Sequence, residues 1–163
     1  MIKNIKFFSL FIVLLFLFTP DIVYSAASGG SDKNNSYTDL YKQAERYVKK
    51  AKKFEKKNKK EKALKLYLKA QKRLIKAYEK DKNNADILNY LGFTLRKEGK
   101  FEEAEKYYLA GLKIKPDHNG INEYLGELYI QTNRIDLAKK RLEVLKNCKC
   151  EEYDELKELI DKN

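Results

Sequence analysis

The sequence contains two stretches that align without a gap at a spacing of 34 residues: NYLGFTLRKEGKFEEAEKYY, which begins at Asn89, and EYLGELYIQTNRIDLAKKRL, which begins at Glu123. A fixed period of about 20 to 50 residues is the signature of repeat architectures, in which each unit buries its apolar faces only against its neighbours. From Tyr37 onward apolar residues recur at intervals of three and four, which is helical spacing. Pro116 lies between two periodic segments, where it would stop a helix. The sequence therefore predicts an all-α fold of repeated helical hairpins.

Small residues occupy equivalent positions in the two units, which span residues 85–118 and 119–150. A glycine on the first helix and an alanine on the second would let the two helices of a hairpin approach closely, because no long side chain intervenes. Gly99 and Asn133 fall at the turns, where a left-handed backbone costs these residues least. The equivalent pairs are Leu91 and Leu125, Gly92 and Gly126, and Ala104 and Ala138.

The segments on either side of these two units predict further helices. Residues 37–84 predict a less regular first hairpin with helices over 37–57 and 62–80, and this first repeat is lengthened by about two helical turns. Residues 151–163 predict a short capping helix with one apolar and one acidic face. The apolar residues of that cap are Tyr153, Leu156, Leu159 and Ile160.

The pattern as a whole resembles the tetratricopeptide repeat (TPR), although the Trp usual at the fourth position is Leu88 in one unit and Asn122 in the next. The resemblance implies an antiparallel helix-hairpin solenoid of about three repeats plus a C-terminal capping helix. The end of the chain, with a Cys pair followed by EEYDELK, is similar to the C-terminal end of small exported bacterial TPR proteins. That likeness implies export and a repeat protein, and it implies no activity.

The N-terminus follows the order of a secretory signal: Lys3 and Lys6, an apolar run over residues 7–18, and then small residues. We predict a signal peptide over residues 1–27 and a flexible linker over 28–36, with the periplasm as the destination. The alternative is an uncleaved anchor in the inner membrane. The apolar run is shorter than the roughly 20 residues that normally span a bilayer, which favours cleavage.

The net charge of +11 is concentrated in one part of the chain. Residues 32–84 contain 19 basic and 7 acidic residues, whereas residues 85–163 contain 14 basic and 16 acidic residues. The basic first hairpin could bind an anionic membrane surface or polymer, or could be a solvated face. The densest run of lysines is residues 49–62, and Phe54 is the only aromatic residue in it that could stack on a base, which disfavours nucleic acid as the partner. The candidate anion-binding residues are Lys49, Lys50, Lys52, Lys53, Lys56, Lys57, Lys59 and Lys60.

The first helices of TPR units line an inner face that holds partner segments, and the resemblance implies the same here. Asn89 and Lys97 are loosely similar to the clamp that some TPR proteins close on a peptide C-terminus. Phe93 stands where that clamp needs Asn, so we predict a mixed groove for an extended segment or a helix instead. The candidate groove residues are Asp86, Asn89, Phe93, Arg96, Lys97, Glu123, Glu127, Ile130 and Gln131.

Residues with catalytic or metal-binding chemistry are few. Cys148 and Cys150 could form a local bridge or remain two semi-buried thiols, and a metal or redox role is the alternative. His118 is the only histidine, and the spacing predicts an exposed loop residue. The sequence has no phosphate-binding loop, nucleophile elbow or metalloprotease motif. We therefore expect a non-enzymatic scaffold without a cofactor or metal, which binds another protein in the bacterial cell envelope.

Overall fold

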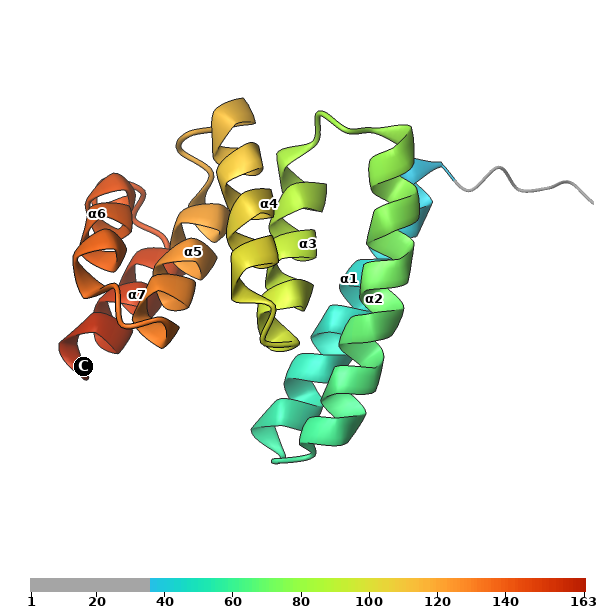
Figure 1. Ribbon diagram of the computed structural model, residues 1–163, viewed down its shortest axis with the longest axis horizontal. Coiled ribbons are helices and arrows are strands. Elements are labelled where there is room, and N and C mark those ends of the chain that lie inside the picture. The colour runs from blue at the N-terminus through green and yellow to red at the C-terminus, as the bar shows by residue number, and fades with distance from the viewer. Residues whose placement is uncertain (1–35) are drawn as a thin grey trace, which may run out of the picture. The chain divides into compact units, whose positions relative to one another are not determined.

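The computed structural model describes residues 36–163, which form seven α-helices and no strand (Figure 1). No described helix is both long and apolar enough to cross a bilayer. The predicted leader, residues 1–27, and the predicted linker up to residue 35 lie outside the described residues. The helices are α1 (Tyr37–Lys56), α2 (Lys60–Lys80), α3 (Ala85–Lys97), α4 (Phe101–Ile114), α5 (Asn119–Gln131), α6 (Ile135–Leu145) and α7 (Glu151–Asp161).

The helix ends follow local sequence chemistry. Asn84 caps α3, because its side-chain oxygen accepts hydrogen bonds from the backbone N–H groups of Asp86 (3.1 Å) and Ile87 (3.2 Å). The turns after α1, α3 and α5 each contain a residue with a left-handed backbone: Asn58 (φ 54°), Gly99 (φ 81°) and Asn133 (φ 57°). Glycine and asparagine adopt this conformation at the lowest cost, so the turns fall where the sequence predicts them.

The helices pair as antiparallel hairpins along the chain (Figure 1). Helix α1 packs against α2, α3 against α4 and α5 against α6, while α7 packs against both α5 and α6. The first hairpin is the long one, since α1 and α2 have 20 and 21 residues whereas α3 and α4 have 13 and 14. Its turn end projects beyond the turn that joins α3 to α4 (Figure 1). The described chain is an all-α helical repeat solenoid with a capping helix.

Small residues lie between the packed helices at the positions that the sequence predicts. Ala104 and Ala138 have no solvent-exposed surface, and neither do Ala70 and Ala77 of the first hairpin. Gly92 faces the ring of the fully buried Tyr108 on α4. Close contact between helices at these positions allows the larger apolar side chains around them to fill the core at high density.

The glycine at the equivalent position of the next unit, Gly126, has a different neighbour from the one expected. A Cβ at Gly126 would lie 2.6 Å from Cδ2 of Leu156, which belongs to α7 and not to the paired helix α6. Leu156 is fully buried, whereas Leu159 of the same helix is 36% exposed. The apolar face of the capping helix is therefore narrower than the predicted one, because α7 docks through Leu156 into the space that Gly126 leaves.

Candidate functional site

The first helices of the hairpins, α1, α3 and α5, form a face that we call the inner face. Its centre is Phe93 of α3, which is buried and surrounded by aromatic rings. The Phe93 ring centroid lies 4.8 Å from that of Tyr124 on α5 and 5.5 Å from that of Tyr67 on α2. Tyr41 of α1 and Tyr90 of α3 form a second pair at 5.6 Å. These distances are typical of aromatic pairs that stabilise a fold beyond their buried area.

Lys52 joins α1 to α5 across this cluster. Its Nζ donates a hydrogen bond of 2.9 Å to the hydroxyl oxygen of Tyr124. The same ammonium lies 5.1 Å from the centroid of the Phe93 ring and 5.2 Å from that of the Tyr124 ring. A cation held over two rings is attracted by both π faces. Lys52 therefore closes the inner face above Phe93.

Two ion pairs connect the inner face to its neighbours. Arg96, whose side chain is 1% exposed, lies 2.6 Å from a carboxylate oxygen of Glu127, whose side chain is 20% exposed. Lys97 pairs with Glu55 of α1 at 3.0 Å, and Tyr67 donates a 2.7 Å hydrogen bond to the same carboxylate. Burial of Arg96 makes the first pair a fixed part of the structure, because separating the charges would leave the guanidinium without compensation.

The predicted groove residues consequently divide into two groups. Asn89, Phe93, Arg96 and Glu123 are buried, so they shape the inner face and do not offer themselves to a partner as the sequence suggested. Phe93 lies under the Lys52 ammonium, Asn89 lies beside Gly120 of α5, and Glu123 faces Glu155 of α7. The residues that remain accessible are Asp86 and Gln131, which are exposed, and Lys97, Glu127 and Ile130, which are half-buried.

Three half-buried tyrosines, Tyr41, Tyr90 and Tyr124, also belong to the inner face, although they are not among the predicted groove residues. Each of the three packs against the core and remains partly accessible to solvent. Burial, with the nearby hydroxyl of Tyr124, raises the pKa of Tyr90 to about 12. The phenol is therefore neutral at physiological pH and can donate a hydrogen bond.

Three carboxyl groups meet where α5 approaches α7. Burial, a hydrogen bond with Glu155 and the negative charge of Glu127 raise the pKa of Glu123 to about 9. Glu123 is 3% exposed, so the proton that it keeps at neutral pH can hold it against the Glu155 carboxylate. This protonated pair joins the inner face to the capping helix.

We expect the free energy of unfolding to fall as the pH rises from about 4.5, the ordinary Glu pKa, to about 9. In this window folded Glu123 holds a proton that the unfolded chain releases, so alkali favours unfolding. Glu123→Gln keeps a hydrogen-bond donor without the titration, and its urea midpoint should change less across the window. Glu143→Gln, at a side chain that is 72% exposed, is the matched control. An equal pH dependence in Glu123→Gln and the native chain would contradict this assignment.

The candidate anion-binding lysines lie mainly on the surface. Lys49 pairs with Glu45 at 3.2 Å, and its side chain remains 69% exposed. Lys52 is the exception in the run, because it is half-buried against Tyr124 and Phe93 and contributes to the inner face. The exposed members are Lys49, Lys50, Lys53, Lys56, Lys57, Lys59 and Lys60.

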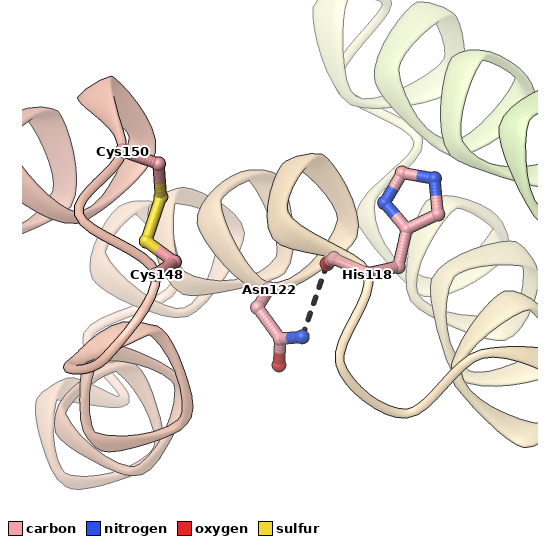
Figure 2. Close-up of a disulfide and its surroundings, with 4 residues drawn as sticks. All are labelled: His118, Asn122, Cys148 and Cys150. Carbon is pink, nitrogen blue, oxygen red and sulfur yellow. Dashed lines mark hydrogen bonds between the residues drawn. A yellow bond between two sulfur atoms is a disulfide. The ribbon is translucent and has the colours of Figure 1, made fainter.

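Cys148 and Cys150 form a disulfide in the loop between α6 and α7 (Figure 2). Lys149 between them has a left-handed backbone (φ 51°), and Cys150 is the residue that precedes the first turn of α7. The disulfide therefore fixes the start of the capping helix. Among residues 36–163, no group of His, Cys, Asp and Glu side chains could hold a metal ion.

His118 is a helix cap and not the exposed loop residue that the sequence suggested. Its Nδ1 accepts a 3.2 Å hydrogen bond from the backbone N–H of Ile121, and its Nε2 lies 3.0 Å from Asp86 Oδ1. Its backbone oxygen accepts a 3.0 Å hydrogen bond from the side chain of Asn122 (Figure 2). These contacts fix the start of α5 beside α3, which accounts for the histidine without a chemical function.

Comparison with known proteins places one repeat of the chain in a family. Residues 85–118 match the model of the tetratricopeptide repeat. The human protein O-mannosyl-transferase TMTC3 is 36% identical over 64 residues, which are 39% of this chain and 7% of that protein. The chain thus spans less than a tenth of the length of this relative.

Solved structures show the same fold at low sequence identity. The Yersinia enterocolitica type III secretion translocator chaperone SycD superposes with a TM-score of 0.53 and 18% identity, covering 80% of this chain and 90% of that chain. SycD in complex with a peptide of the translocator YopD gives a TM-score of 0.51 and 17% identity, covering 72% and 86%.

Proposed function

Because the chain is a tetratricopeptide-repeat protein, we propose that it is a non-catalytic scaffold that holds a segment of a partner protein against its inner face. The observation that supports this proposal is the set of accessible aromatic and charged side chains around the buried Phe93. Tyrosine offers a large rigid contact area with a polar end, and such residues are frequent among those that dominate binding energy. The peptide complex of SycD, which has the same fold, supports this class of partner.

The accessible residues also suggest the character of the bound segment. The rings of Tyr41 and Tyr90 pack against each other at an interplanar angle of 59°, and the negative charge of Asp86 helps to raise the pKa of both hydroxyls. Lys97 and Glu127 supply a charge of each sign, both already paired within the protein. A segment with apolar side chains and few charges fits this face better than a highly charged one, because the paired charges do not need a further partner.

Affinity capture with paired variants tests this function. The native chain and Tyr41→Ala/Tyr90→Ala are used to capture proteins from an extract of the cell envelope, and the affinity of each captured protein is then measured. We expect the double variant to bind about tenfold more weakly or worse, because such residues commonly supply more than 1 kcal/mol each. Leu109→Ala/Ile114→Ala, at exposed residues of α4, is the matched control and should bind normally. Equal affinities of the two double variants, with the fold intact by circular dichroism, would contradict the proposal.

The cellular place of the protein is part of the proposal. The order of basic, apolar and small residues over residues 1–27 supports export to the bacterial envelope. Mass spectrometry of the N-terminus of the protein recovered from a periplasmic extract tests it. A chain that is cleaved after Ser25 or Ala27 is the expected result, and an uncleaved chain in the cytoplasmic fraction would contradict it.

A second candidate function is binding to an anionic membrane surface or polymer through the exposed lysines of residues 49–60. The observation that favours it is the exposure of seven of these lysines after Lys52 is set aside. Lys53→Gln/Lys56→Gln/Lys57→Gln should then lower retention on a heparin column. Lys113→Gln/Lys139→Gln/Lys140→Gln carries the same loss of charge on α4 and α6. Equal retention of the two variants would reject a specific site on the first hairpin.

A further inference from the structure

The first hairpin carries a groove that belongs neither to the inner face nor to the lysine run of residues 49–60. It has a volume of about 510 Å³, and we call it the basic groove. Helix α2 supplies most of its wall, since Lys69, Arg73 and Lys76 recur at helical spacing along one side. The residues that line the basic groove are Tyr47, Lys69, Lys72, Arg73, Ile75, Lys76 and Glu79.

The cations of the basic groove have no internal partners. Within residues 36–163, no ion pair or hydrogen bond joins Lys69, Lys72, Arg73 or Lys76 to another side chain. The inner face differs in this respect, because Arg96 and Lys97 there each contact a carboxylate. These four cations outnumber Glu79, the carboxylate that lines the same groove, so the groove has a net positive charge that favours a bound anionic group.

The opposite end of the repeat stack carries unpaired carboxylates. Helix α7 is acidic over its first turn, where Glu151 and Asp154 are exposed and Glu152 is half-buried. In the part of the chain that the structure describes, none of the three forms an ion pair. The later carboxylates of the helix differ, since Glu158 contacts Lys162 and Asp161 contacts Lys157.

Both ends of the stack are also faces without a neighbouring hairpin. Among the described elements, α1 and α2 have a neighbour only on the side of α3, and α7 has neighbours only in α5 and α6. Every hairpin in the middle of the stack is covered on both sides, because a repeat buries its faces against the next one. Apolar side chains remain exposed at both ends: Ile75 in the basic groove is 43% exposed, and Leu159 of α7 is 36% exposed.

We propose that the basic groove binds the acidic first turn of α7 from a second copy of this chain. The two surfaces are complementary in charge, each has an exposed apolar residue, and each is an open end of the same stack. A helix placed along the groove would bring Glu151 and Asp154 to Arg73 and the neighbouring lysines, where bidentate contact between guanidinium and carboxylate is available. The contact is heterologous, so it leaves a free groove and a free α7 at the two ends of each pair.

This self-association goes beyond the scaffold function and does not use the inner face. It would place several inner faces side by side, and a partner with repeated segments would then bind with higher avidity. Its electrostatic origin predicts a strong dependence on ionic strength, because interactions between exposed charges are screened over about 10 Å at 0.1 M salt.

Analytical ultracentrifugation of the full chain tests the proposal. The native chain should show a mass that rises with protein concentration at low salt and falls to that of one copy at high salt. Lys69→Glu/Arg73→Glu/Lys76→Glu should weaken the association about tenfold or more, because like charges would then face each other. This reversal also makes the chain less positive overall, so general repulsion between copies cannot cause the loss.

Two matched controls separate this contact from a general charge effect. Lys113→Glu/Lys139→Glu/Lys140→Glu makes the same charge change on α4 and α6 and should associate as the native chain does. Glu151→Lys/Asp154→Lys reverses the other surface and should also abolish association, whereas Glu102→Lys/Glu103→Lys on α4 should not. Thermal melting of each variant shows that α7 and the rest of the fold remain intact.

The most decisive experiment mixes the two charge-reversal variants, Lys69→Glu/Arg73→Glu/Lys76→Glu and Glu151→Lys/Asp154→Lys. Each alone has two surfaces of the same sign and should remain a single copy. In the mixture, the acidic groove of one variant faces the basic α7 of the other, so association should return to within about threefold of the native strength. A native chain that stays a single copy at low salt, or a mixture that fails to associate, would overturn the proposal. Heparin retention that depends on Lys69, Arg73 and Lys76 without self-association would show that the groove takes a foreign anion instead.

Discussion

Glu127→Ala is expected to lower the free energy of unfolding by about 3–5 kcal/mol, because it leaves the Arg96 guanidinium buried without a counter-charge. Arg96 has a side chain that is 1% exposed, and the carboxylate of Glu127 lies 2.6 Å from it. The rings of Phe93 and Tyr124 lie within 5.7 Å of the guanidinium carbon and offset part of the loss. Urea denaturation of the two chains measures the difference.

Replacement of the whole pair distinguishes a buried charge from lost packing. Arg96→Met alone should cost less than Glu127→Ala, because the Glu127 side chain is 20% exposed and water can solvate it. In the double variant Arg96→Met/Glu127→Ala no charge stays buried without a partner, so much of the stability should return. If the costs of the single variants simply add in the double variant, Glu127 acts through packing and the ion pair does not matter.

The repeat period explains how much of the fold could be predicted. Gly92 and Ala104 recur at fixed positions because close helix contact admits only small residues there, and the structure places both in such contacts. Gly99 and Asn133 have the left-handed backbone expected at their turns. These features depend on residues that are near in sequence or repeat with the period. The Cys pair does not recur with the period, so no repeat position predicts its backbone, and the left-handed Lys149 between the two cysteines was not predicted.

The inner face could be located from the sequence but its accessibility could not. Helical spacing identifies which side of α3 and α5 faces inward, and it gives no information about side chains that arrive from another hairpin. The hydrogen bond from Lys52 to Tyr124 joins residues that are 72 positions apart. It depends on how α1 is placed over α3, which is a property of the packed stack. The sequence therefore predicts that Phe93 contacts a partner, whereas the structure shows that it is buried.

The density of lysines along the sequence also failed to identify which of them lie together in the structure. The densest run of lysines in the sequence is residues 49–62, yet Lys52 within it serves the inner face. The basic groove is formed by a more widely spaced set on α2, where Lys69, Arg73 and Lys76 line one wall. Density along the chain does not identify such a groove, because helical geometry and the neighbouring helix decide which charges converge.

Gly92→Ala is expected to destabilise the protein by about 1–3 kcal/mol, although alanine favours a helix by about 1 kcal/mol over glycine. A Cβ at Gly92 would lie 2.6 to 2.8 Å from three atoms of the Tyr108 ring. Tyr108 is fully buried, so its ring cannot move aside without disturbing the packing of α3 against α4. The loss of stability is measured by thermal and urea denaturation.

A second background reverses the expected sign of this substitution. Tyr108→Leu removes the ring and costs stability itself, but it makes room for a methyl group at position 92. Within that background Gly92→Ala should therefore stabilise the chain by up to about 1 kcal/mol, the gain expected from helix propensity alone. The cycle isolates the contact between the two residues, because only their direct interaction differs between the backgrounds. Equal destabilisation by Gly92→Ala in both backgrounds would show that the glycine is needed for another reason than the approach of Tyr108.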